Sequence, residues 1–282
     1  MYFGQKLRHS IEQGEITPFI GVYDVFSAAI AGKYFSGIFI SGFSFAASFY
    51  GLPDIGFISW SDIVAFSQRV KTILPNHHIL VDIDDGYFDT EVACHVVSIL
   101  ESMGITGVIL EDQKRPRKCG HLGNKQLLDT DEYLLKLNKV LATRQDLFVI
   151  ARTDATDIED ILFRVEMYSQ TDADAILVDG IKDLNLLLKI KEITNKPIVF
   201  NNIAGGKSPL CGLTELQQAG VSLVNYSTPC LFTAQSAIEQ EMQRLKENDV
   251  KLQNTAITVA TCTNFLEENL YSRDNTQNHY PY

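Results

Sequence analysis

The stretch Gly107-Val-Ile-Leu-Glu-Asp112 decides the fold, because its short apolar run is followed at once by two acids. Seven further apolar runs recur along the 282-residue chain, with helical patterns between them: FIGV (19–22), GIFI (37–40), ILVDID (79–84), LFVIARTD (147–154), AILVDG (175–180), PIVFNN (197–202) and VSLVNY (221–226). Near-continuous apolar strands that alternate with helices indicate a parallel sheet covered on both faces. This pattern predicts an α/β fold, a (β/α)8 TIM-type barrel, with a doubly wound open sheet as the alternative.

Polar residues follow the apolar part of most of these runs, which favours the barrel over the open sheet. They are Ser41, Asp82, Asp84, Glu111, Arg152, Asp154, Asp179, Asn201 and Asn202. In a (β/α)8 barrel the carboxyl-terminal ends of the strands form the active-site face. We therefore expect the chemistry of this chain at that face.

The helical patterns and the length of the chain indicate one catalytic domain with an extension. Residues 1–246 are long enough for the whole barrel, and residues 232–246 read as a helix after the last strand. Residues 247–271 form a C-terminal helical extension that a finished barrel does not need, so we expect it to pack on a neighbouring subunit. The polar tail, residues 272–282, is expected to be disordered.

Composition limits the kind of partner. The net charge of −11 argues against a nucleic acid or an anionic membrane, since either would attract a basic face, and favours a small-molecule ligand. The five cysteines are irregularly spaced and fit neither a disulfide framework nor a CxxC zinc pattern. With no secretory leader and no long apolar run in view, the sequence predicts a cytoplasmic, reduced protein.

Three carboxylates form a candidate metal site. Asp82 and Asp84 lie two positions apart at a strand end, so they share a face, and Glu111 ends the next strand. Oxygen ligands without paired histidines favour Mg²⁺, with Mn²⁺ possible, over zinc. The alternative is that Asp84-Asp85-Gly86 is only a turn.

Cys119 is the candidate catalytic thiol. It lies in a polar loop rather than in an apolar periodic segment, so it has no core to fill. Its neighbours Arg115, Arg117, Lys118 and His121 are expected to favour the thiolate.

Arg152 and two glycine-containing turns are candidate anion binders. A planar guanidinium at a strand end can clamp a carboxylate or a phosphonate, although an ion pair with Asp154 or Asp179 is the alternative. The backbone amides of Ser41-Gly42-Phe43 and of the loop around Gly205-Gly206-Lys207 can approach an anion, or both segments can be simple turns.

His77 and His78 precede the third strand, at the amino-terminal side of the barrel, where residues serve stability rather than catalysis.

Together these residues resemble the isocitrate lyase and phosphoenolpyruvate mutase superfamily, in particular its short branch of methylisocitrate, dimethylmalate and petal-death-type lyases. The resemblance covers roughly residues 17–240 and follows the order of the superfamily's motifs. These motifs are GVYDVFSA (21–28), SGFSFAASFYGLPDIG (41–56), VDIDDGY (81–87), LEDQKRPRKCGHLGNK (110–125), ARTDA (151–155) and NNIAGGKSP (201–209).

The resemblance implies a magnesium site at Asp82, Asp84 and Glu111, with Asp54 contributing through water. It implies that Arg152, helped by Ser41, Gly42 and Phe43, binds a substrate carboxylate. The further residues expected to bind substrate are Lys118, Gly120, Asp179 and Asn202.

In the lyases that this chain resembles, a Cys-Gly-His loop closes over the substrate, and its thiol protonates the carbanion formed when a C–C bond breaks. Cys119-Gly120-His121 matches that loop, whereas the mutases carry an asparagine-bearing sequence there. Catalytic roles are therefore expected for Cys119, His121 and Arg152. The resemblance also implies a homotetramer, a dimer of dimers that exchange their terminal helices.

Three departures from the superfamily pattern bear on the substrate. Phe88 stands in the usual Asp-Thr-Gly-Tyr-Gly turn, Asp179 replaces a frequent glutamate, and Ala204 replaces another. The first hypothesis is a magnesium-dependent carbon–carbon lyase acting on a 2-hydroxy di- or tricarboxylate. The alternatives are phosphonate chemistry, either mutation or phosphonopyruvate hydrolysis, oxaloacetate decarboxylation or hydrolysis, and a non-catalytic carboxylate-binding barrel.

Overall fold

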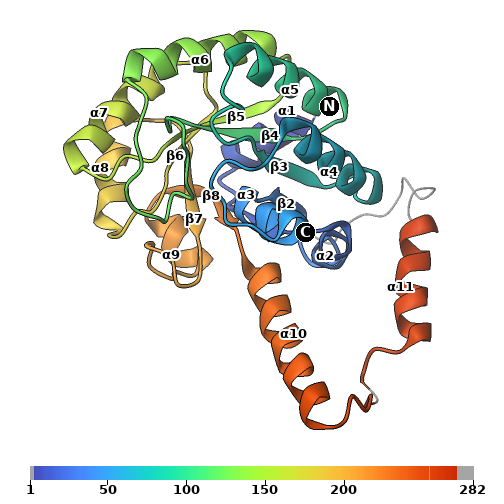
Figure 1. Ribbon diagram of the computed structural model, residues 1–282. Coiled ribbons are helices and arrows are strands. Elements are labelled where there is room, and N and C mark those ends of the chain that lie inside the picture. Colours follow the sequence, from blue (N-terminus) through green and yellow to red (C-terminus); the bar gives the residue numbers. More distant parts are fainter. Residues whose placement is uncertain (1–2, 254, 272–282) are drawn as a thin grey trace.

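The computed structural model describes residues 3–253 and 255–271, and it confirms the predicted barrel. Eight parallel strands pair in chain order and close on themselves, so the open-sheet alternative is wrong (Figure 1). The tail 272–282, predicted to be disordered, lies outside the described residues. The strands are β1 (Thr17–Val22), β2 (Gly37–Ile40), β3 (His78–Asp82), β4 (Gly107–Glu111), β5 (Phe148–Thr153), β6 (Ala175–Val178), β7 (Ile198–Asn202) and β8 (Val221–Tyr226).

Helices precede the barrel, alternate with its strands and follow it. They are α1 (Phe3–Glu12), α2 (Val25–Ala31), α3 (Gly42–Phe45), the π-helix η1 (Ala46–Tyr50), α4 (Trp60–Ile73), α5 (Thr90–Ser102), α6 (Thr130–Thr143), α7 (Ile158–Ser169), α8 (Asn185–Ile193), α9 (Leu213–Gln218), α10 (Pro229–Glu247) and α11 (Val259–Tyr271). Among the described residues, none of these helices combines the length and the apolar character that crossing a lipid bilayer requires.

Several helices begin at an aspartate cap that follows a strand. Asp24 accepts a hydrogen bond from the Ser27 amide at 2.6 Å, and Asp157 accepts two from the start of α7. Such caps satisfy backbone N–H groups that have no partner inside the helix. They fix where each helix starts after its strand.

The barrel interior has an apolar layer with a largely polar layer directly above it. The apolar layer includes Phe19, Phe39, Leu80, Ile109, Ile150, Leu177, Val199 and Leu223. Side chains two positions apart on a strand share a face, so the residue two positions later on each strand points into the same interior. These residues are Gly21, Ser41, Asp82, Glu111, Arg152, Asp179, Asn201 and Asn225. The packed apolar floor thus carries a polar ring at the carboxyl ends of the strands.

The C-terminal arm extends beyond the barrel. Figure 1 shows α10 projecting away from the barrel, and α10 has no buried residue. In α11, Phe265 packs edge-to-face on Phe26 of α2, and Glu268 pairs with Lys33 at 2.6 Å. The second helix predicted after the barrel is present as α11, whereas its exchange between subunits and the domain boundary at residue 246 stay predictions.

Candidate active site

Four carboxylates converge at the ends of β3 and β4. Asp82 ends β3 and Glu111 ends β4. Between them the chain turns through Asp84, whose φ of 52° lies in the left-handed region, and the Glu111 amide donates to the Asp84 carbonyl at 2.9 Å. Asp54, on the segment after η1, is also buried. The alternative to a metal site was that Asp84-Asp85-Gly86 is only a turn. The segment is a turn, and this turn brings Asp84 beside Glu111.

Arg117 lies among these carboxylates. Its guanidinium pairs with Asp54, with Asp84 at 3.3 Å and with Glu111 at 2.7 Å, and the residue is only 1% exposed. We expected Arg117 to act on the neighbouring cysteine. It is instead the counter-charge of the acid cluster.

Burial shifts the pKa values of three of these acids upward. Burial raises the pKa of Asp82, of Asp84, and of Glu111 to about 8, against the opposing effect of nearby arginines. Desolvation and mutual repulsion both disfavour the charged carboxylates. Additional positive charge would therefore stabilise this cluster.

The donor set fits a hard divalent cation, although Arg117 occupies its centre in this conformation. In the described part of the chain, Asp84 Oδ1 and Glu111 Oε2 accept no hydrogen bond, and no three His, Cys, Asp or Glu side chains form a ready-made metal site. A Cβ on Gly42 would lie 3.1 Å from Asp84 Oδ1, so glycine keeps this space open. Carboxylate oxygens are the ligands that Mg²⁺ prefers.

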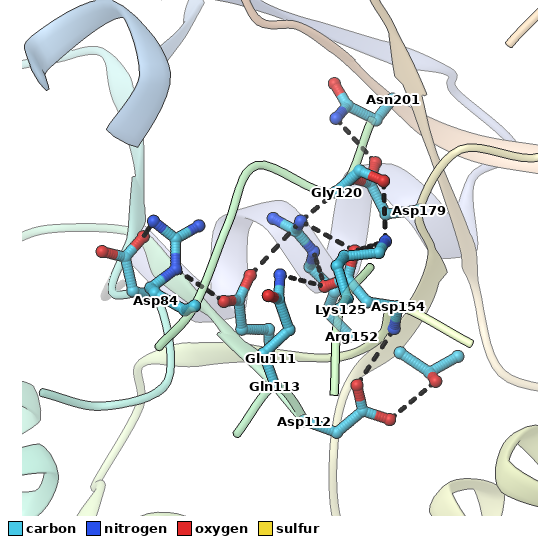
Figure 2. A network of polar contacts seen from close by, with 12 residues as sticks. Asp84, Glu111, Asp112, Gln113, Gly120, Lys125, Arg152, Asp154, Asp179 and Asn201 are labelled. Carbon is cyan, nitrogen blue, oxygen red and sulfur yellow. Dashed lines mark hydrogen bonds and ion pairs between the residues drawn. The ribbon is translucent and has the colours of Figure 1, made fainter. Parts of the chain in front are cut away.

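Arg152 connects the acid cluster to the acids that follow the neighbouring strands β5 and β6. It lies 3.2 Å from Glu111 Oε2, 3.1 Å from Asp154 Oδ2 and 2.9 Å from Asp179 Oδ2 (Figure 2). The ion pairs that we considered as an alternative role are therefore present. They hold the guanidinium charged and in a fixed orientation at the end of β5.

Asp179 is another acid that pairs with Arg152. Burial raises its pKa, but Arg152 and His121 outweigh burial and hold the pKa of Asp179 well below its usual range. The Asn201 amide donates to Asp179 at 2.8 Å (Figure 2). Asp179 is thus a permanent anion that orients Arg152.

The loop of residues 113–127 is closed over the site. Gln113 and Leu127 form a β-bridge at its base, and the Cys119 amide donates to the Asp54 carbonyl at 3.0 Å. Lys125 donates to Asp154 at 2.8 Å and to the Gly120 carbonyl at 2.6 Å. A Cβ on Gly120 would lie 1.7 Å from Asp179 Oδ2, so only glycine fits here.

Lys207 holds the loop from the other side. Its amide donates to His121 Nδ1 at 2.8 Å, and its ammonium donates to the carbonyls of Gly120 and Leu122 at 3.0 and 2.9 Å. His121 Nδ1 is therefore an acceptor, which leaves the proton on Nε2, 3.5 Å from Asp179. The Gly205-Gly206-Lys207 segment thus fastens the loop.

The expectation that Cys119 is a thiolate is wrong. Burial, together with Asp54 and Asp179, raises the pKa of the Cys119 thiol to about 12. Arg115 pairs with Asp85 at 2.7 Å and Arg117 with the acid cluster, so neither cation serves the sulfur. The thiol is held protonated.

A small cavity of about 20 Å³ lies beneath the closed loop. Of the predicted site residues, those that line it are Ser41, Phe43, Asp54, Asp82, Cys119, Gly120, Arg152 and Asp179. This volume suits a single water rather than a carboxylate substrate. Substrate entry therefore requires the loop to open.

Other predicted residues lie around the cavity rather than in its lining. Asn202 donates to the Cys211 carbonyl at 3.3 Å, and the Lys118 amide donates to Gln113 at 2.9 Å. Gly42 does not close a tight turn; it begins α3, which Ser41 caps. Ala204 and Phe88 are exposed, so of the three departures only Asp179 lines the cavity.

The structure adds residues that the motifs did not single out. Asn225 and Ser227 line the cavity, and Lys125 reaches Asp154 beneath the loop. A strict two-residue alternation along β8 would have pointed to Asn225, because Leu223 and Asn225 share a face. The ion pair of Lys125 with Asp154 depends on loop closure, which no local pattern predicts.

The fold and this site define a (β/α)8 barrel with a buried acid–arginine centre under a cysteine-bearing loop. A sequence model of the family described as phosphoenolpyruvate phosphomutase matches residues 7–246, and the chain belongs to that family.

Named relatives and a solved structure extend this comparison. The chain is 34% identical to the chloroplastic carboxyvinyl-carboxyphosphonate phosphorylmutase of Arabidopsis thaliana, over 86% of this chain and 74% of the relative. It is 30% identical to the 2-methylisocitrate lyase of Halalkalibacterium halodurans, over 86% and 81%. A structure of oxaloacetate acetylhydrolase with 3,3-difluorooxalacetate matches with a TM-score of 0.90 at 27% identity, covering 96% of both chains.

Proposed function

We propose that this chain is a carbon–carbon lyase that cleaves a 2-hydroxy di- or tricarboxylate into an α-keto acid and a smaller carboxylate. The observation that carries the proposal is the buried, protonated thiol of Cys119, which lines the same cavity as Arg152 and Asp82. A thiol that keeps its proton at neutral pH is suited to donate it to a carbanion. The similarity to a 2-methylisocitrate lyase supports the same reaction.

In the proposed reaction, the substrate hydroxyl releases its proton to solvent, and the carbonyl of the keto acid forms as the C–C bond breaks. The bonding electrons remain on the carbon next to the second carboxylate, as an enolate-like carbanion. The Cys119 proton moves to that carbon and leaves a thiolate, which regains a proton from solvent. His121, held between Lys207 and Asp179, orients the loop that carries the thiol.

Arg152 binds and orients the carboxylate of the substrate in this proposal. Its contacts with Asp154 and Asp179 fix the plane of the guanidinium before the substrate arrives. Binding to such a preorganised donor avoids reorganisation in the transition state.

Asp82, Asp84 and Glu111, with Asp54 through water, would hold Mg²⁺ or, less favoured, Mn²⁺. Within the described residues, the six buried carboxylates of the centre face three cationic side chains, Arg117, Arg152 and Lys125. Because burial raises the pKa values of Asp82, Asp84 and Glu111, a divalent cation would stabilise their charged forms. When bound, Mg²⁺ supplies Lewis-acid stabilisation of the developing keto acid.

The proposal is tested by assaying the protein with Mg²⁺ against 2-hydroxy di- and tricarboxylates and following keto-acid release. Cys119→Ser should lower turnover by about 100-fold or more, since general acid catalysis contributes about 100- to 10,000-fold. Cys94→Ser, another buried cysteine but on the α5 helix, is the matched control and should keep full activity. Full turnover by Cys119→Ser would contradict the proposed proton donor.

A second candidate is hydrolysis or decarboxylation of oxaloacetate. The similarity to oxaloacetate acetylhydrolase supports this candidate, and Asp179, which lines the cavity where the lyases frequently have a glutamate, also motivates it. Oxaloacetate belongs in the same assay, and its consumption without cleavage of any hydroxy acid would select this candidate.

For the assembled protein we propose a homotetramer in the cytoplasm, in which paired subunits exchange their terminal helices. The exposed apolar side chains of the projecting arm, including Ile238 and Met242, support burial against a second copy. The five cysteines, all free, suit a reducing compartment.

A further inference from the structure

Asn225 lines the cavity, but its side chain takes no part in the hydrogen bonds and ion pairs around Arg152 and Asp179. It is 1% exposed, and in the described part of the chain neither Nδ2 nor Oδ1 has a hydrogen-bond partner. Buried amides are nearly always paired, because leaving donors and acceptors unmade is costly. Two unpaired polar atoms in a cavity with room for a single water mark a position for that water or for a ligand group that displaces it.

The barrel places Asn225 at the level of the catalytic residues. A register shift at the start of the β7–β8 pair brings Val199 beside Leu223 and Asn201 beside Asn225. Both asparagines therefore belong to the polar ring, one step above the apolar floor. Asn225 lines the same small cavity as Cys119 and Arg152.

The neighbour Asn201 makes the contrast clear. Its Nδ2 donates to Asp179 at 2.8 Å, and its Oδ1 accepts from Ser227 at 2.6 Å. Both polar atoms of Asn201 are thus paired within the protein, whereas those of Asn225, beside it in the register, are not.

The surroundings of Asn225 define the chemistry it can recognise. The cavity floor is formed by Phe39, Ile109 and Leu177, and its cation, Arg152, is already paired with acids. A carboxylate at Asn225 would meet the donor Nδ2 but would also face the acceptor Oδ1. A neutral group that both donates and accepts matches both atoms.

We propose that Asn225 is a specificity-determining residue that binds the hydroxyl or carboxamide of a substituent on the substrate carbon bearing the second carboxylate. This inference rests on the proposed lyase function for the identity of the substrate, and it narrows that substrate to one with a polar rather than a purely alkyl substituent. An enzyme built to hydrogen-bond such a group discriminates strongly against the analogue that lacks it.

The test uses matched pairs of 2-hydroxy dicarboxylates that differ only in a CH₂OH or a CH₃ group at carbon 3. The wild-type enzyme with Mg²⁺ should prefer the hydroxylated member by about 10-fold or more in kcat/KM, and Asn225→Leu should bring this ratio close to one. Asn225→Leu should also raise Tm, because an apolar side chain of similar size replaces unpaired polar atoms. Asn201→Leu is the matched control and should lower Tm, since it breaks two hydrogen bonds.

Two results would overturn the proposal: a wild-type preference for the methyl member, or an unchanged ratio in Asn225→Leu. An unchanged ratio together with a lowered Tm would mean that Asn225 holds only an ordered water. If no hydroxy acid is cleaved, the proposed function fails by itself. Calorimetric Kd values for the same pairs then decide the role of Asn225, with equal affinity of the wild type for both members ruling it out.

Discussion

Gly120 is the residue on which loop closure most directly depends. A Cβ at this position would lie 1.7 Å from Asp179 Oδ2 and 2.4 Å from Asp154 Oδ1, well inside van der Waals contact. We predict that Gly120→Ala folds normally but loses about 100-fold in kcat/KM, because a displacement of about 1 Å costs that much when it moves a catalytic group. Steady-state kinetics on the preferred hydroxy acid would measure it.

Gly123→Ala in the same loop is the control for this prediction. A Cβ there has no neighbouring atom within 4 Å, so the substitution should leave kcat/KM unchanged. Limited proteolysis would separate the two further, because an open loop is cleaved sooner. Equal activity of the two variants would mean that the closed conformation is not the reactive one.

At the residue scale, sequence reasoning predicted residues that the structure brings together, but it did not always predict their ionisation. Cys119, Arg152, Asp82 and Glu111 were identified from strand ends and loop polarity, and the structure brings all four to one centre. The ionisation of Cys119 was missed because the sequence shows which charges are near in the chain, whereas burial and pairing decide a pKa. Arg117 lies two positions from Cys119 in the sequence, but its guanidinium pairs with Glu111 instead of the sulfur.

At the scale of elements, the strands were predictable because each buried parallel strand is a continuous apolar run. All eight observed strands overlap the predicted runs, from Thr17–Val22 to Val221–Tyr226. The helix that begins at Gly42 was not expected, since its sequence also suits a turn and the deciding feature is the Ser41 cap. The fastening of the loop by Lys207 joins segments 86 positions apart, which no local periodicity encodes.

The strand β3 carries a prediction about acid stability. His78 begins this strand, and burial, with the nearby cation Lys71, lowers its pKa to about 4. The unfolded chain takes up a proton near pH 6.5, whereas the folded chain does so only near pH 4. Stability should therefore fall as the pH drops from 6.5 to 4, by up to about 3 kcal/mol from this group.

Urea unfolding at pH 7.0 and pH 4.5 would measure this dependence. The His78→Asn variant should lose less stability than the wild type between these two pH values. Part of the pH dependence should remain in this variant, because burial also lowers the pKa of His77. His9→Asn, at an exposed position of α1, is the control and should keep the wild-type slope. Identical slopes for wild type and His78→Asn would contradict the assignment.

At the scale of the whole molecule, the arm of α10 and α11 is the part that the barrel does not explain. Ile238 and Met242 lie four positions apart on α10, so they share one face, and they are 58% and 54% exposed. We predict that Ile238→Glu weakens the proposed helix-exchanged assembly, because a charge would be buried where the two copies meet. Light scattering coupled to size-exclusion chromatography should then report a smaller species at micromolar concentration.

Gln240→Glu adds the same charge on the opposite face of α10 and should keep the wild-type mass. A monomeric wild-type protein, or equal masses for the two variants, would place the arm outside the subunit interface.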